Sequence, residues 1–227
     1  MTLLLARVSA LRLIRTPRAW LPIIVWALLA IVVAVAARSS GSTTGASHVL
    51  RGTFSFLVLP LVSFAVVGAT LGRTGLRQGI RGVVALGAAP RSAAFASIFV
   101  AVITSALLAA LLAVMVNVVA HGAHDPPLGS DLFATAWIAA LGGGAYAAYF
   151  SAGSAIGKGM MRGVFLAFDW IVGGGAGVGA LITPRGHVTS LLGGAACAEL
   201  TQRASSVALL LILAGYTLLA LLLVRRT

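Results

Sequence analysis

The chain has 227 residues, of which 60% are hydrophobic and 9% are charged, and its mean hydropathy is +1.07. Soluble domains contain about 45–50% apolar and about 25% charged residues, so the composition predicts a single-domain, all-α integral membrane protein. The net charge is +12, but the basic residues lie between apolar runs and form no face with interleaved aromatic side chains. Nucleic acid is therefore not an expected partner.

The N-terminal segment and the apolar runs divide the chain. Residues 1–18 hold four arginines and are expected to form an interfacial basic helix on the membrane surface. Residues 19–227 are predicted to form one transmembrane domain of six helices. The stretch 38–53 is interpreted as a polar loop, and 190–200 as a re-entrant or surface helix. The predicted spans are about 19–37, 54–71, 92–120, 132–156, 164–183 and 207–224.

The distribution of basic residues predicts the orientation. Twelve of the sixteen lie in the N-terminus, the segment 72–91, the turn 157–163 and the C-terminus. The opposite loops contain only Arg38, Arg51, Arg185 and Arg203. The positive-inside rule therefore places both termini in the cytoplasm. We expect a multi-pass protein of the bacterial cytoplasmic (inner) membrane.

The segment 72–91, between the second and third spans, contains Arg73, Arg77, Arg81 and Arg91 and no acidic residue. On a helix, the first three arginines recur every four residues and form one stripe. The adjoining face carries Leu76 and Ile80. This pattern predicts a short cytoplasmic helix; the alternative is a loop whose arginines only hold the orientation.

A run of apolar residues, a basic stretch ending in LGAAPRS and a long apolar helix together resemble the join between the second and third helices of ABC-2 type transporter permeases. The basic N-terminal helix, the six spans and the excursion between the last two also resemble that family. Arg73-Thr74-Gly75 stands where the family commonly has an acidic residue. The residues Ala85-Leu86-Gly87-Ala88 and Arg91 are similar to a sequence pattern of FtsX- and MacB-type permeases.

Either resemblance implies a permease subunit whose cytoplasmic ABC ATPase partner binds ATP and Mg. It also implies a coupling role for Arg73, Arg77, Arg81, Leu76, Ile80 and Arg91. A second permease, identical or related, is the other expected partner. The chain itself is not expected to bind a cofactor or to be an enzyme, because it lacks a phosphate loop of the form G-x-x-x-x-G-K-[ST]. The expected cargo is hydrophobic or amphiphilic.

Asp169 is the only acidic residue expected within the bilayer. Such residues usually face a cavity or a partner, because a charge in the hydrocarbon region is costly. We expect either a structural ion pair, with Lys158 and Arg162 on the same side, or a role in transport or coupling. Tyr146 and Tyr149 share one face of the fourth span and either line a cavity or pack in the bundle.

Two further features favour contacts between helices. Asn117 in the third span is a candidate for an interhelical hydrogen bond. The glycines of the fifth span have the spacing that allows two helices to approach closely, namely Gly173 with Gly177 and Gly175 with Gly179. His121, His124 and Asp125 have a ligand-like spacing, but the prolines that follow argue against a metal site.

Two other functions stay open. One is a membrane scaffold or regulator that couples to an ABC ATPase without transporting anything. The other is an intramembrane enzyme that depends on Asp169 or the histidines.

Overall fold

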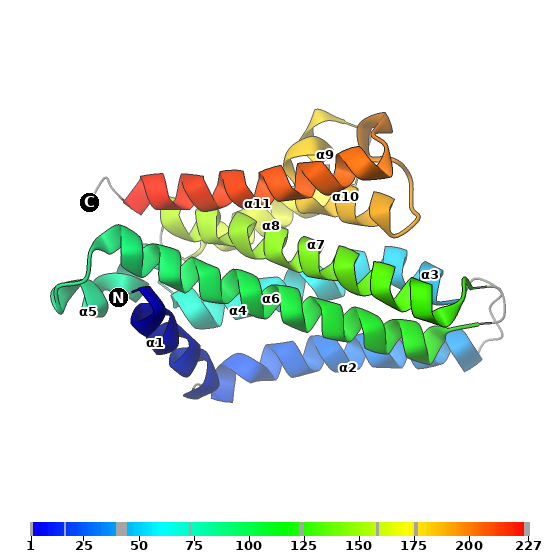
Figure 1. Ribbon diagram of the computed structural model, residues 1–227, viewed down its shortest axis with the longest axis horizontal. Coiled ribbons are helices and arrows are strands. Elements are labelled where there is room, and N and C mark those ends of the chain that lie inside the picture. Colours follow the sequence, from blue (N-terminus) through cyan, green and yellow to red (C-terminus); the bar gives the residue numbers. More distant parts are fainter. Residues whose placement is uncertain are drawn as a thin grey trace.

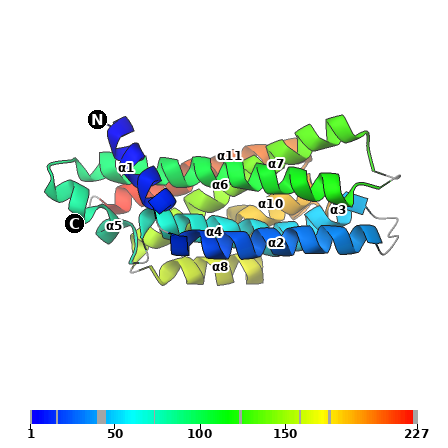
Figure 2. The same cartoon turned by 90° about the horizontal axis from the view of Figure 1, so that it is seen from below.

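The computed structural model describes residues 2–15, 17–39, 45–72, 74–122, 125–157, 159–174 and 177–224, with only the backbone for residues 2, 3, 15 and 17–19. All regular secondary structure in these ranges is helical. Four long helices lie side by side in the bundle (Figures 1 and 2). They are α2 (Pro17–Ser39), α6 (Pro90–Ala120), α7 (Leu128–Ile156) and α11 (Gln202–Val224).

The shorter elements complete the bundle and mark its two ends. The chain begins with α1 (Thr2–Arg15), which lies beside α5 (Leu76–Ala85) at the end where α11 finishes (Figure 1). We call this the α5 end and the opposite one, where α3 (Gly45–Val49) lies, the α3 end. The other elements are η1 (Leu50–Val58, a π-helix), α4 (Leu59–Leu71), α8 (Met161–Val172), α9 (Val178–Ile182), α10 (Pro184–Leu191) and η2 (Cys197–Glu199, a 3₁₀ turn).

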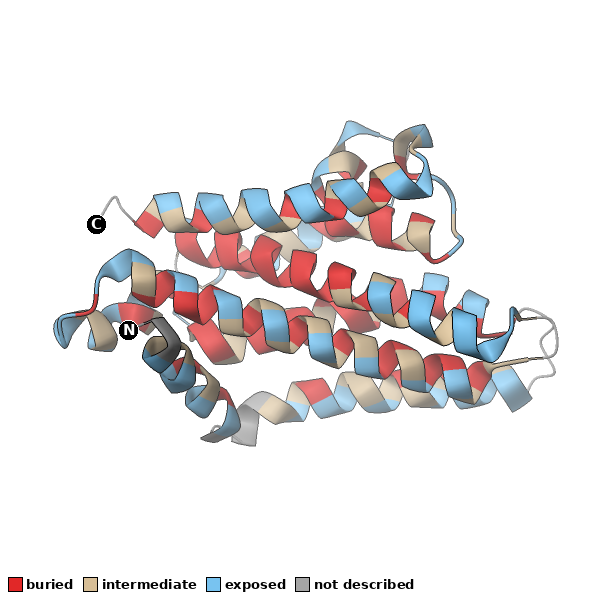
Figure 3. Ribbon diagram, viewed as in Figure 1, coloured by how far each residue is buried: buried red, intermediate tan, exposed pale blue. Residues whose placement is uncertain are grey.

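The outer surface of the bundle is apolar, as a bilayer requires. Large hydrophobic side chains on α2, α6 and α11 are exposed, whereas α7 is buried along its middle (Figure 3). Five helical runs in the described ranges are long and apolar enough to cross a membrane: α2, the run that includes η1 and α4, α6, α7 and α11. The protein is therefore all-helical, with the features of a multi-pass membrane protein.

Helix α7 is the centre of the bundle, and its glycines explain how closely its neighbours pack. A Cβ added to Gly143 would come within 2.7 Å of the Ala109 Cβ and the Ser105 carbonyl oxygen on α6. A Cβ on Gly142 would come within 2.7 Å of Val188 on α10. Small residues thus allow two helix backbones to approach α7 from different sides.

The described residues of the predicted loop 38–53, which are 38–39 and 45–53, are helical in the structure. Helix α2 continues to Ser39, α3 begins at Gly45, and η1 then leads directly into α4. The N-terminus of α3 is capped from elsewhere in the chain, because the Ala46 N–H donates to Asp125 Oδ2 at 2.9 Å. A cap that lies 79 residues away is not visible in the local pattern.

The predicted fifth span, 164–183, is not one continuous helix. Helix α8 ends at Val172 and has 12 residues, or about 18 Å, which is too short for a hydrocarbon layer of about 30 Å. The chain turns after Gly173, forms the five-residue α9, and enters α10 at Pro184. Glycine costs about 1 kcal/mol relative to alanine within a helix, so the run of glycines favours this break. The helical excursion expected at 190–200 is formed mainly by α10, earlier in the chain.

Helix α10 extends beyond α8 toward the α3 end (Figures 1 and 2). It packs against α7, α11 and η1. Thr183 has a β-region backbone with ψ of 148°, as expected for a residue before proline, and Pro184 occupies the first helical position. From α8 to α10 the chain thus forms a discontinuous helix, and the short helix α9 lies within the interruption.

Candidate functional site

Asp169 lies next to the break between α8 and α10. It is in the last turn of α8 and is fully buried. Its Oδ2 accepts a hydrogen bond from the Tyr146 hydroxyl at 2.9 Å, and its Oδ1 accepts one from the Arg185 backbone N–H at 3.3 Å. One carboxylate therefore joins the end of α8 to α7 and to the start of α10. The Asp169 carboxylate is thus buried with hydrogen-bond donors from two other helices.

The basic side chains near Asp169 have other partners. Arg162, expected as an ion-pair partner, lies at the opposite end of α8, where it donates to the Gly72 carbonyl oxygen at 3.0 Å. Arg185 donates from Nη1 to the Trp170 carbonyl oxygen at 2.9 Å, and its guanidinium lies over the Phe56 ring at 4.3 Å. Lys158 lies outside the described residues. In the described ranges, no basic side chain forms a salt bridge with Asp169.

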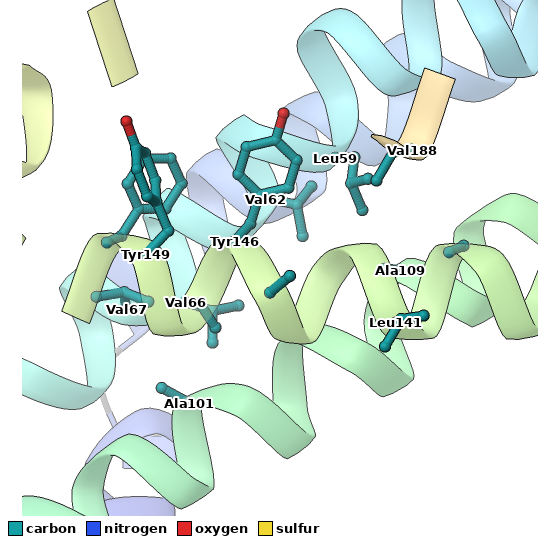
Figure 4. Packing of buried hydrophobic residues seen from close by; sticks show 14 of the residues in the cluster. Leu59, Val62, Val66, Val67, Ala101, Ala109, Leu141, Tyr146, Tyr149 and Val188 are labelled. Carbon is teal, nitrogen blue, oxygen red and sulfur yellow. The ribbon is translucent and has the colours of Figure 1, made fainter. Parts of the chain in front are cut away.

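Tyr146 and Tyr149 project from the same side of α7 (Figure 4), and both are buried. The Tyr149 hydroxyl donates to the Phe165 carbonyl oxygen at 2.9 Å, so both tyrosines bond α8. The Tyr149 ring meets the Tyr216 ring of α11 edge-on at 5.0 Å. Both tyrosines therefore hold α8 against α7 with their hydroxyls, and the Tyr149 ring also packs against α11.

Asn117 joins α6 to α7. Its Nδ2 donates to Asp131 Oδ2 at 2.7 Å and to Thr135 Oγ1 at 3.1 Å. Asp131, near the α3 end, thus accepts a hydrogen bond from the Asn117 side-chain amide.

The glycines expected at a close helix contact were Gly173 with Gly177 and Gly175 with Gly179, but α8 ends at Val172, before the described members of these pairs. Gly173 caps α8, and a Cβ there would come within 2.7 Å of Thr183 Oγ1. Gly179 lies in α9 against Val172, while Gly177 precedes α9 and has open space around it. Gly175 lies outside the described residues. Gly173 and Gly179 therefore allow close contacts within the turn between α8 and α10.

A cavity of about 380 Å³ lies between η1 and this break. Its polar lining includes Arg51 and Ser55 of η1 and Arg185 and Thr189 of α10. The sequence does not predict this cavity, because Arg51 and Arg185 lie in stretches with the pattern of loops. The glycine run was the one signal in the sequence that marked its position.

The coupling residues predicted from 72–91 lie at the α5 end. Leu76 and Ile80 are buried on the inner side of α5, where they pack the helix against the bundle. Arg77 donates from Nη2 to the Leu223 carbonyl oxygen of α11 at 2.9 Å. Arg81 and Arg91 are exposed. Arg73 lies outside the described residues.

Helix α5 is held closely by its neighbours. Gly79 packs directly against the Leu71 carbonyl oxygen of α4, and its own carbonyl oxygen accepts a hydrogen bond from Arg12 of α1 at 3.1 Å. Gly75, with φ of +102°, precedes α5, and a Cβ there would come within 2.8 Å of the Ser154 carbonyl oxygen of α7. A second cavity, of about 540 Å³, is lined by Arg77, Arg81 and residues at the ends of α7 and α11.

Comparison with known proteins gives no assignment: no family model, no curated protein and no solved structure matches the chain.

Proposed function

We propose that this chain is the membrane-spanning subunit of an ATP-binding cassette transporter of the ABC-2 type. In this proposal a separate cytoplasmic ATPase docks at the α5 end and drives the export of an amphiphilic substrate, and two permease subunits act together. The observation that carries the proposal is the attachment of α5, a short helix between two spans that is bonded to several other helices.

Each attachment gives a route by which a force on α5 reaches the bundle. Gly79 abuts α4, and Arg77 bonds the last turn of α11. Arg162 bonds Gly72, just before α5, to the start of α8. A displacement of α5 therefore moves α4 and α11 or breaks their contacts with it, and it reaches α8 through Gly72 at the end of α4.

Helix α8 links the two sites of the chain. Arg162 at its start faces the α5 end, and Asp169 in its last turn bonds Tyr146 and the start of α10. A displacement of α8 therefore acts on the discontinuous helix next to the 380 Å³ cavity. Discontinuous helices at membrane depth are a feature of transporter substrate sites, which supports transport over a scaffold role.

The exposed basic surface at the α5 end supports an acidic partner. Arg81 is exposed on α5, Arg91 is exposed at the start of α6, and Arg81 also lines the 540 Å³ cavity. Charges of one sign on a docking surface select a partner of the opposite sign and speed its association.

The test is a detergent pull-down of the tagged protein from its native host. An ATPase with a phosphate-loop motif is expected to copurify with the wild-type chain and to be lost from the Arg81→Glu/Arg91→Glu variant at equal expression. Arg203→Glu, an exposed arginine at the start of α11, is the matched control and should retain the partner. If no ATPase copurifies with the wild-type chain, or if the control loses it equally, the proposal is wrong.

A further inference from the structure

Two irregular backbone segments face each other inside the bundle. One is η1, nine residues of π-helix, and the other is the break between α8 and α10. The Trp170 indole N–H of α8 donates to the Phe56 carbonyl oxygen of η1 at 3.0 Å, which ties the two segments together. Irregular backbone at membrane depth occurs where it is buried in protein or lines a polar cavity, and π-helical turns are frequent at functional sites.

The cavity between these segments is positively charged. Arg51 and Arg185 line it, and its described lining contains no acidic residue. Asp169, which is bonded to the Arg185 backbone, already accepts hydrogen bonds from Tyr146 and from the Arg185 N–H. Two guanidinium groups are therefore the charged groups of the described lining.

Arg185 is held in place for binding. Its Nη1 donates to the Trp170 carbonyl oxygen, and the guanidinium plane is supported by the Phe56 ring at 4.3 Å. Its Nε and Nη2 donate to no described residue. Arg51 has one long contact, from Nη1 to the Gly193 carbonyl oxygen at 3.5 Å. A guanidinium that is fixed at one nitrogen and available at the others presents the donor pattern that phosphate and carboxylate groups bind.

Hydroxyl groups complete the lining. Thr189 Oγ1 lies 3.4 Å from Ser55 Oγ, so one hydroxyl from α10 and one from η1 meet at the cavity. The volume of about 380 Å³ falls within the range of about 300–1,000 Å³ typical of small-molecule sites. A phosphomonoester carries about −1.5 to −2 charges near pH 7, which balances two guanidinium groups better than one carboxylate does.

We propose that the cavity binds a phosphate group through Arg51 and Arg185. Under the proposed function, on which this last step rests, the phosphate is the headgroup of the transported amphiphile. A phosphate bound to Arg185 then affects the break between α8 and α10, because the Arg185 backbone N–H bonds Asp169 and its side chain bonds Trp170, both in α8. Binding itself needs neither the ATPase nor transport.

The test is calorimetric titration of the purified full-length chain in a neutral detergent. Inorganic phosphate and a short-chain phosphatidic acid are titrated separately, so that a free phosphate and a lipid headgroup are distinguished. Wild type is compared with Arg51→Gln, Arg185→Gln and the matched control Arg203→Gln, an exposed arginine outside the cavity. Arg51 is exposed and has a single long contact, so its variant is expected to keep the wild-type gel-filtration profile even if Arg185→Gln does not.

Phosphate-specific binding predicts a dissociation constant at least about tenfold higher in Arg51→Gln, as expected for the loss of one charge-assisted hydrogen bond, and an unchanged value in Arg203→Gln. If only the phosphatidic acid binds with this pattern, the site takes a lipid headgroup. If inorganic phosphate also binds, the phosphate alone is sufficient. The proposal is overturned if neither probe binds, if Arg51→Gln binds like wild type, or if Arg203→Gln loses as much affinity. Because no ATPase is present, these results are independent of the pull-down.

Discussion

The bond between Tyr146 and Asp169 allows a direct test of how the buried Asp169 carboxylate contributes to stability. Tyr146→Phe removes one hydroxyl and keeps the ring that packs in the core. Among the described residues, the Arg185 backbone N–H at 3.3 Å then still donates a hydrogen bond to the buried Asp169 carboxylate. Tyr149→Phe, one helical turn away, is the matched control, because its hydroxyl bonds a neutral carbonyl oxygen at the same 2.9 Å.

The two substitutions are expected to differ in magnitude. A hydrogen bond to a charged group contributes about 1.5–3 kcal/mol, whereas hydrogen bonds between membrane helices average about 0.6 kcal/mol. For a chain of this size, about 1 kcal/mol shifts the melting temperature by about 2–4 °C. We therefore expect Tyr146→Phe to lower it by about 3–12 °C and Tyr149→Phe by about 1–2 °C.

Cys197 provides the assay. It is the single cysteine of the chain and is buried. Burial also raises the pKa of its thiol, so little thiolate is present near pH 7 and background labelling is slow. A maleimide dye that fluoresces on reaction with the thiol, added to detergent-solubilised protein during heating, therefore reports the opening of the fold.

Equal shifts in the two tyrosine variants would refute the reasoning, because they would show that the Asp169 carboxylate adds nothing to an ordinary interhelical bond. A double variant, Tyr146→Phe with Asp169→Asn, separates the pairwise contribution from the loss of the hydroxyl. The coupling expected between the two positions is about 0.5–3 kcal/mol, as found for residues in direct contact.

Two further predictions use the same assay. Gly79→Ala should lower the melting temperature because its Cβ would overlap the Leu71 carbonyl oxygen, whereas Gly82→Ala, in the same helix with open space around it, should leave it unchanged or slightly higher. Equal effects would contradict the close approach of α5 to α4. Asn117→Ala should cost up to about 1.7 kcal/mol because it removes the hydrogen bond to Asp131 across the α6–α7 contact. An unchanged melting temperature would show that this contact contributes no stability.

The long apolar helices were predictable from the sequence because hydrophobicity and length act locally. The predicted spans near 92–120, 132–156 and 207–224 correspond to α6, α7 and α11, each a few residues longer at its start. The break at Gly173 was the exception. Composition alone favoured a span there, but the glycine run and the approach of Thr183 to the end of α8 end the helix.

The partners of the polar residues were not predictable. Asp169 was recognised as an unusual buried acid, but Arg162, near it in sequence, faces the other end of α8, and Tyr146 on another helix is its donor. Arg185 was counted only as a loop residue. Its position depends on α10 folding back against η1, which no local pattern specifies.

The sequence by itself determined that the chain is an apolar helical membrane protein with a basic segment between two of its long helices, because bilayer partitioning and helix formation depend on composition within each segment. Only the tertiary structure decided where helix α8 ends, which residues bond Asp169, and that η1 and α10 enclose a cavity with two arginines. Several similar apolar helices can pack in many ways, and the choice among those packings is made by steric fit and hydrogen bonds between residues far apart in the chain.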